Sequence, residues 1–226
     1  MRRIATRFIL PVAVLCLGTV PAAAQNLLFD YVGFDYESPD PDPNTFGEIG
    51  AGYNGLGDVP VLLAPLSPDT SMFQYTYAIS GLTVLSRDVV GDFVIIDYTG
   101  SGVLQIYEDS KTTGTNRDYG DNPPNATAPS SFTDGTLFLE GDLTGFQFIF
   151  NTATGSGSYE GVFNASGGSQ LPSIPEDERT GWTFAGATEN DLNIPEGYYH
   201  QIDGQVFLNK PSPVERTTWG RIKSGQ

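Results

Sequence analysis

His200 is the single histidine of the chain and therefore the residue best suited to acid–base chemistry near neutral pH. A Ser/His/Asp triad would have to use this imidazole, yet the chain contains no G-x-S-x-G motif to hold a nucleophilic serine. A zinc site built from His and Cys is also excluded, because the only cysteine, Cys16, falls in an N-terminal leader. We interpret His200 as a half-buried strand residue, and we expect no catalysis.

A polar excursion from Asp109 to Thr133 carries oxygen atoms that could bind a cation. Calcium prefers carboxylate, amide and carbonyl oxygens, so calcium is the candidate ion, and no other cofactor is required. The alternative is a hydrophilic surface connection held by packing of Tyr119 and Phe132 on a sheet. The candidate metal ligands are Asp109, Asp118, Asp121 and Asn122.

Two further acidic groupings have spacings that resemble known sites. Asp40, Asp42 and Asn44 match the first ligands of a calcium loop, but the glycine and the distal glutamate of an EF-hand are missing. Glu140 and Asp142 could serve as the paired carboxylates of a glycan-acting hydrolase. Because 27 acidic residues guarantee chance pairs, this hydrolase is only a second alternative.

Three aromatic residues on late strands offer a different function, that of a carbohydrate-binding module. Sugar rings stack on exposed tryptophan and tyrosine side chains, and amides and carboxylates lie close in the sequence. The alternative is that these rings fill the core, which a chain this rich in Phe and Tyr must build from aromatics. The candidate sugar-binding residues are Trp182, Tyr198 and Tyr199.

The charge of the chain limits its partners. The formal net charge is −16, and between Gln25 and Asn209 there are 26 acidic residues but only four basic ones. Such a surface repels phosphate backbones and anionic lipid headgroups, so nucleic acid is not an expected partner. The carboxylates form either a solvated face that maintains solubility or ligands for calcium.

The elements that must position these residues are strands, because apolar and polar residues alternate over long runs. Phe73, Tyr75, Tyr77 and Ile79 share one face, and a turn is predicted at Ser80-Gly81. Further turns are predicted at 99–102 and, as a hairpin, at 141–145. These antiparallel runs predict an all-β domain over residues 25–209, with the architecture of a jelly-roll-like β-sandwich.

Both ends of the chain differ from this domain. Residues 1–24 read as a signal peptide, with Arg2, Arg3 and Arg7 before an apolar stretch and an A-x-A cleavage site at 22–24. No later apolar run is long enough to cross a bilayer. Residues 210–226 form a basic tail, which is either a sorting or attachment peptide, a disordered end or a strand that docks on the acidic body. We expect a secreted or cell-surface protein.

The central part of the chain resembles a known group of proteins. The strings GVLQIYEDSKTTGTNRDYGDNPPNATAPSSFTDGTLFLEGDLTGF, GSGSYEGVFNASGGSQL and GWTFAG look like uncharacterised bacterial exported proteins of the PEP-CTERM-associated type, over about Ile79 to Asp203. The resemblance implies a β-sandwich without an established activity. The sorting tail of that group, with Pro-Glu-Pro and an apolar helix, is absent from this sequence.

These observations together predict a non-catalytic exported protein with a structural or interaction role at the cell surface or in the extracellular matrix. The expected partner is a polysaccharide or a surface protein, and calcium is the candidate stabilising ion. The carbohydrate-binding module is the first alternative.

Overall fold

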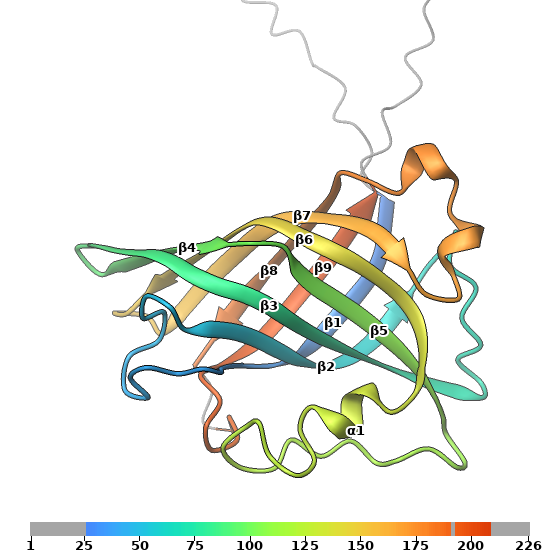
Figure 1. Cartoon of the computed structure of the whole chain (residues 1–226), viewed down its shortest axis with the longest axis horizontal. Helices are drawn as coiled ribbons and strands as arrows, with labels where there is room; N and C mark the ends of the chain where they lie inside the picture. Colours follow the sequence, from blue (N-terminus) through green and yellow to red (C-terminus); the bar gives the residue numbers. More distant parts are fainter. Residues whose placement is uncertain (1–25, 191–192, 209–226) are drawn as a thin grey trace, which may run out of the picture.

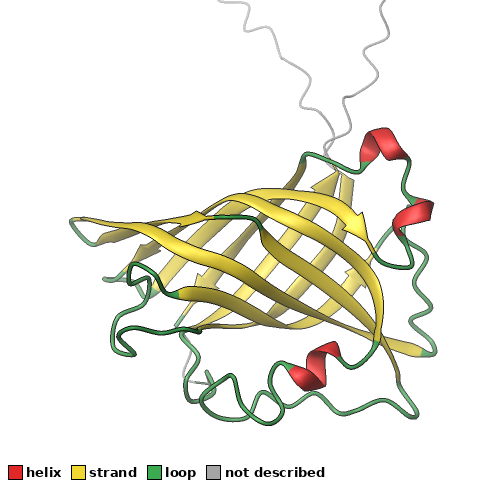
Figure 2. Ribbon diagram, viewed as in Figure 1, coloured by secondary structure: helices red, strands yellow, loops and turns green. Residues whose placement is uncertain are grey.

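The computed structural model describes residues 26–190 and 193–208, more than half of them in the strands of one antiparallel sheet (Figures 1 and 2). The predicted signal peptide and the predicted tail lie outside these residues. The short helices are α1 (Ser130–Thr133) and the 3₁₀ turns η1 (Leu171–Ser173) and η2 (Glu176–Glu178). The strands are β1 (Asn26–Glu37), β2 (Gly52–Leu62), β3 (Phe73–Val90), β4 (Phe93–Thr99), β5 (Gly102–Ser110), β6 (Thr136–Asn151), β7 (Ser156–Gly167), β8 (Trp182–Glu189) and β9 (His200–Leu208).

The sheet closes on itself as an eight-stranded antiparallel barrel. Strands that follow each other in the chain pair with each other, except β4 and β5, and β1 closes the ring by pairing with β9 from Asn26↔Leu208 to Asp35↔His200. Strands β4 and β5 together occupy one position, since both lie between β3 and β6. The predicted β-sandwich, which the family resemblance also implied, is therefore wrong. Alternation showed which face of each strand is buried, but it did not distinguish two stacked sheets from one closed sheet.

The three predicted turns inside this region are also wrong, because the chain does not reverse at any of them. Residues 80–81 lie within β3, and residues 141–145 lie within β6. At residues 99–102 the chain passes from β4 to β5 without reversing, because both strands pair with β3 and β6 in the same antiparallel sense. Gly81 and Gly145 have φ angles of +82° and +61°, and each lies where the register shifts against β2 or β7. Such bulges kink a strand and increase its twist, which a closing sheet requires.

The faces of the strands agree with the predicted alternation. Tyr75, Tyr77 and Ile79 of β3 are buried in the barrel interior, which we call the lumen, while Gln74 is half-buried on the outer face. Rings from most strands fill the lumen, as expected for a barrel of eight strands. The largest fully buried aromatic side chains of this core are Phe29, Tyr31, Tyr53, Tyr77, Phe138, Phe148, Phe163, Trp182 and Phe184.

Two glycines make room for two of these rings. Across neighbouring strands, Tyr31 of β1 pairs with Gly204 of β9, which pairs with Gly186 of β8, which pairs with Tyr159 of β7. A Cβ atom on either glycine would collide with a tyrosine hydroxyl. The row therefore places two adjacent glycines between two tyrosines, and the rings lie across the glycine backbone.

The polar excursion lies on the outside of the barrel, along β1, β2 and β3 (Figure 1). Tyr119 and Phe132 pack there in a second apolar cluster with Phe34 and Tyr198. The Thr76 hydroxyl of β3 donates to the Phe132 carbonyl at 2.7 Å. The excursion is thus a connection fixed to the sheet by its two aromatic residues, as the second interpretation predicted.

Candidate functional site

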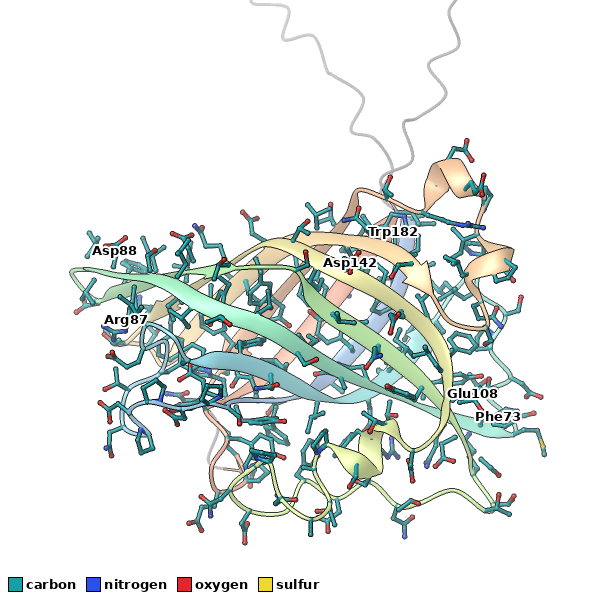
Figure 3. The ribbon with its side chains drawn as sticks, viewed as in Figure 1. Phe73, Arg87, Asp88, Glu108, Asp142 and Trp182 are labelled. Atoms are coloured by element: carbon teal, nitrogen blue, oxygen red, sulfur yellow. The ribbon has the colours of Figure 1, made fainter. Side chains whose placement is uncertain are left out.

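A pocket of about 350 Å³ lies at one end of the barrel. We call this rim the pocket end; it carries the connections 38–51, 91–92, 152–155 and the described part of 190–199. Figure 3 places Arg87 near the projecting tip of the β3–β4 hairpin, and Phe73 and Glu108 at the opposite end of the barrel. The polar lining consists of Asn44, Thr45, Arg87, Thr152, Asn190 and His200, and the aromatic lining of Phe46, Phe150 and Tyr199.

His200 lies in the wall of this pocket and is held there by Asp35. The β1–β9 register places the two residues directly opposite each other, with both side chains inside the barrel. Imidazole Nδ1 lies 3.1 Å from both carboxylate oxygens of Asp35, and the His200 backbone N–H donates to Asp35 Oδ1 at 2.8 Å. The carboxylate therefore fixes the ring, and Nε2 remains as the nitrogen that can meet a ligand.

Aromatic rings surround this imidazole. The ring centroids of Phe46 and Phe150 lie 4.5 Å and 4.7 Å from that of His200. His200 is 3% exposed, so it is more deeply buried than the sequence interpretation expected. Because the Asp35 carboxylate and two aromatic rings enclose the imidazole, the ring is held in one orientation. A side chain held in this way presents its free ring nitrogen in a fixed direction, which suits recognition of a bound molecule.

Arg87 brings a positive charge to the same pocket. It lies opposite Ile96 in the β3–β4 pair, which turns its side chain toward the inner face of the hairpin. Its Nε–H donates to the Phe46 carbonyl at 3.3 Å. Among the described residues, no carboxylate lies within 4.0 Å of its guanidinium. Among the described residues, Arg117 and Arg179 each lie within 4.0 Å of a carboxylate, so Arg87 differs from the other two arginines in this respect.

Glu37 lies two residues beyond Asp35 on the same strand and is 4% exposed. The Gly47 N–H donates to its Oε1 at 2.9 Å, while Oε2 has no hydrogen-bond partner among the described residues. Burial, together with the nearby charges of Asp40, Asp35 and Glu48, raises the pKa of Glu37 to about 8. This carboxyl is therefore largely neutral at pH 7, which lowers the negative charge at the pocket end.

The loop between β1 and β2 is organised by the triplet that resembled a calcium loop. Asp42 accepts hydrogen bonds from the Asn44 backbone N–H at 3.1 Å and from the Thr45 hydroxyl at 2.9 Å. Asp40 accepts from the Tyr199 hydroxyl at 2.8 Å, and this bond, after burial, raises the pKa of Tyr199. These carboxylates position the residues of the pocket wall.

The four predicted calcium ligands have separate protein partners. Asp109 accepts from Gln74 at 3.2 Å near the start of β3, and Asp118 accepts from the Gly120 N–H at 3.0 Å. The Asp121 carbonyl accepts from Asn125, whereas the Asn122 N–H donates to Glu196 in the β8–β9 connection. In residues 26–190 and 193–208, no group of three or more His, Cys, Asp or Glu is arranged to hold a metal ion. The calcium hypothesis stays a prediction.

Of the three predicted sugar-stacking aromatics, Tyr199 lines the pocket. Trp182 is 1% exposed and stacks against Phe163, and its indole N–H donates to the Glu178 carbonyl. Tyr198 is 8% exposed and donates to the Tyr119 carbonyl at 2.9 Å. Trp182 therefore belongs to the barrel core and Tyr198 to the cluster outside it.

The predicted hydrolase pair lies elsewhere, on β6. Glu140 accepts from Gln105 at 2.6 Å, and Asp142 is exposed on the same strand, away from the tip that carries Arg87 (Figure 3). Sequence reasoning missed Arg87 in the pocket lining and the buried acids Asp35 and Glu37 at the pocket end. The sequence does show that each of these residues is a charged residue in a stretch of strand with apolar neighbours. It does not show that they lie close together, because this depends on strand pairings between residues far apart in the sequence.

Comparison with known proteins adds no relative: no family model, no curated protein and no solved structure matches this chain. None of the helices in the described part of the chain has the length and apolar character needed to span a bilayer.

Proposed function

We propose that this protein is an exported, non-catalytic binding protein that holds a single sugar-sized ring in the pocket at one end of its barrel. The observation that carries this proposal is the pocket itself, which combines aromatic walls with amide, hydroxyl and imidazole groups. Small-molecule sites of about 300–1,000 Å³ share this design, since apolar walls bury the ligand and a few polar groups orient it.

The size and position of the pocket support one ring rather than a long chain. Aromatic side chains fill the lumen, so a ligand enters only at the pocket end. The C–H faces of a sugar can pack on Phe46, Phe150 and Tyr199, while its hydroxyls meet Asn190 and His200. This arrangement retains the carbohydrate-binding hypothesis but transfers it from exposed aromatics to an enclosed site.

Hydrogen bonding around His200 supports binding over hydrolysis. A hydrolytic nucleophile must bond the imidazole that activates it. The Thr45, Thr152 and Tyr199 hydroxyls donate instead to Asp42, Asp92 and Asp40. Export and a surface location rest on the predicted signal peptide and on the resemblance to exported bacterial proteins, and a polysaccharide end is the proposed partner.

The single histidine provides a direct test of the site. In tag-free protein, the carbon-bound ring protons of His200 give one resolvable set of NMR signals. We expect these signals to move and to saturate when monosaccharides, neutral and acidic, are added at millimolar concentration. If no sugar of a broad panel shifts them, the binding proposal is wrong and a purely structural role becomes the better explanation.

A further inference from the structure

Resting on the proposed sugar-binding function, we propose that the pocket selects an acidic sugar: Arg87 binds its carboxylate and His200 Nε2 a neighbouring hydroxyl. The ligand class is a uronic acid, either free or as the terminal residue of an acidic polysaccharide.

The bonding of Arg87 is the first step of this inference. Only its Nε–H has a protein acceptor, the Phe46 carbonyl, which holds the side chain without neutralising it. The planar guanidinium keeps further N–H donors in a geometry that matches a carboxylate. Arg117, by contrast, is paired with Asp58, and Arg179 lies 3.8 Å from Glu176.

The second step concerns what surrounds that charge. In a molecule of net charge −16, long-range repulsion disfavours anions, so an anion site needs a local positive charge and little competing acid. Among the described residues of the pocket lining, Arg87 is the only basic one apart from the imidazole, and none of them carries a carboxylate. One guanidinium balances one negative charge, which favours a carboxylate over a phosphate dianion.

The third step is the imidazole. Because Asp35 accepts at Nδ1, the ring nitrogen left for the ligand is Nε2, which accepts a hydroxyl hydrogen when the imidazole is neutral. A uronic acid carries its carboxylate and its hydroxyls on one ring. Its apolar C–H faces then match Phe46 and Phe150, which flank the imidazole.

Calorimetry on the full tag-free chain tests this selection. Glucuronate and galacturonate would be compared with glucose and galactose at constant ionic strength. We expect the acids to bind about tenfold or more tightly than the neutral sugars, as a charge-assisted hydrogen-bond pair would give. Arg87→Gln should remove this preference, so that acidic and neutral sugars bind with similar affinity, and Arg87→Lys should retain only part of it.

The matched control is Arg179→Gln at the opposite end of the barrel. Arg179 also donates from Nε to a backbone carbonyl, that of Ile174, at 3.0 Å, so its substitution removes the same charge and the same kind of contact. We expect this variant to bind uronates like the unaltered protein. Melting curves of both variants would show that each remains folded.

The outcomes separate the two proposals. Equal affinity for acidic and neutral sugars, with shifts of the His200 signals, would overturn acid selection and leave sugar binding in place. An acid preference that survives Arg87→Gln, or that is lost equally in Arg179→Gln, would also overturn it. If neither kind of sugar binds, both proposals fail together.

Discussion

At the scale of single residues, two acidic side chains, Asp35 and Glu37, are buried at the pocket end of a barrel whose interior is lined by aromatic and aliphatic side chains. Asp35 is fully buried beneath His200, and Glu37 is nearly so. Asp35 offsets the cost of its burial by accepting from the His200 ring and backbone, whereas one oxygen of Glu37 has no partner among the described residues. The two acids therefore should respond differently to substitution and to pH.

Glu37→Gln should weaken the pH dependence of stability. Below pH 4.5 the carboxyl is protonated in both the folded and the unfolded chain, but between pH 4.5 and about 8 only the folded chain keeps the proton. Stability should therefore fall across this window in the unaltered protein, by a few kcal/mol at most. The variant should melt higher at pH 8 and similarly at pH 5; parallel curves of melting temperature against pH would contradict this.

Asp35→Ala should destabilise the fold by about 1–3 kcal/mol, because the buried His200 N–H loses its acceptor. Asp35→Asn retains an acceptor oxygen and should cost less. Urea unfolding of both variants measures the difference. Equal losses for Ala and Asn would mean that packing, and not hydrogen bonding, makes Asp35 important.

At the scale of elements, long strands are bent by glycine bulges instead of being cut into hairpins. A hairpin turn and a bulge both use glycine at positive φ, so the residues at 80–81 and 141–145 are compatible with either. What decides between them is the partner strand: β2 pairs with β3 on both sides of Gly81, and β7 pairs with β6 on both sides of Gly145, each across a shift in register. A single sequence does not contain that information locally.

Gly145→Ala tests the bulge in β6. A Cβ atom would meet nothing within 4 Å, so any cost comes from the φ angle of +61° alone. A left-handed conformation at a residue with a side chain should cost about 1–2 kcal/mol. Denaturant unfolding should show this loss; a variant as stable as the unaltered protein would argue against the positive φ at this bulge.

The row of tyrosines and glycines across β1, β9, β8 and β7 makes a different prediction. Gly204→Ala should cost about 1–3 kcal/mol through overpacking against the Tyr31 hydroxyl. Tyr31→Leu removes both the hydroxyl and the Cζ atom that a Cβ at residue 204 would meet, so the double variant should be more stable than the two single losses predict by addition. Strictly additive losses in this cycle would show that the two residues do not compete for space.

At the scale of the whole molecule, net charge opposes folding. A net charge of −16 on the whole chain creates self-repulsion, which salt screens over a Debye length of about 10 Å at 0.1 M. Melting temperature should therefore rise with sodium chloride. The calcium hypothesis requires a further rise with calcium chloride at equal ionic strength that a chelator reverses. Identical melting in the two salts would eliminate calcium as a specific ligand.

The sequence predicted the parts of the fold that depend on neighbouring residues. The inward face of β3, the strands around residue 150 and the packing of Tyr119 and Phe132 follow from alternation and from local hydrophobicity. The barrel did not follow, because the decisive pair, Asp35 and His200, is separated by 165 residues. The pocket was missed for the same reason: Arg87, Tyr199 and His200 meet only once β1 has paired with β9.

The closure between β1 and β9 also fixes how the molecule would be displayed. Asn26 and Leu208 are paired neighbours on the rim opposite the pocket end, so both described chain ends leave from one place (Figure 1). Any tether joined after Leu208 would hold the barrel by that rim. The pocket proposed to bind sugars would then face away from any surface to which such a tether is attached.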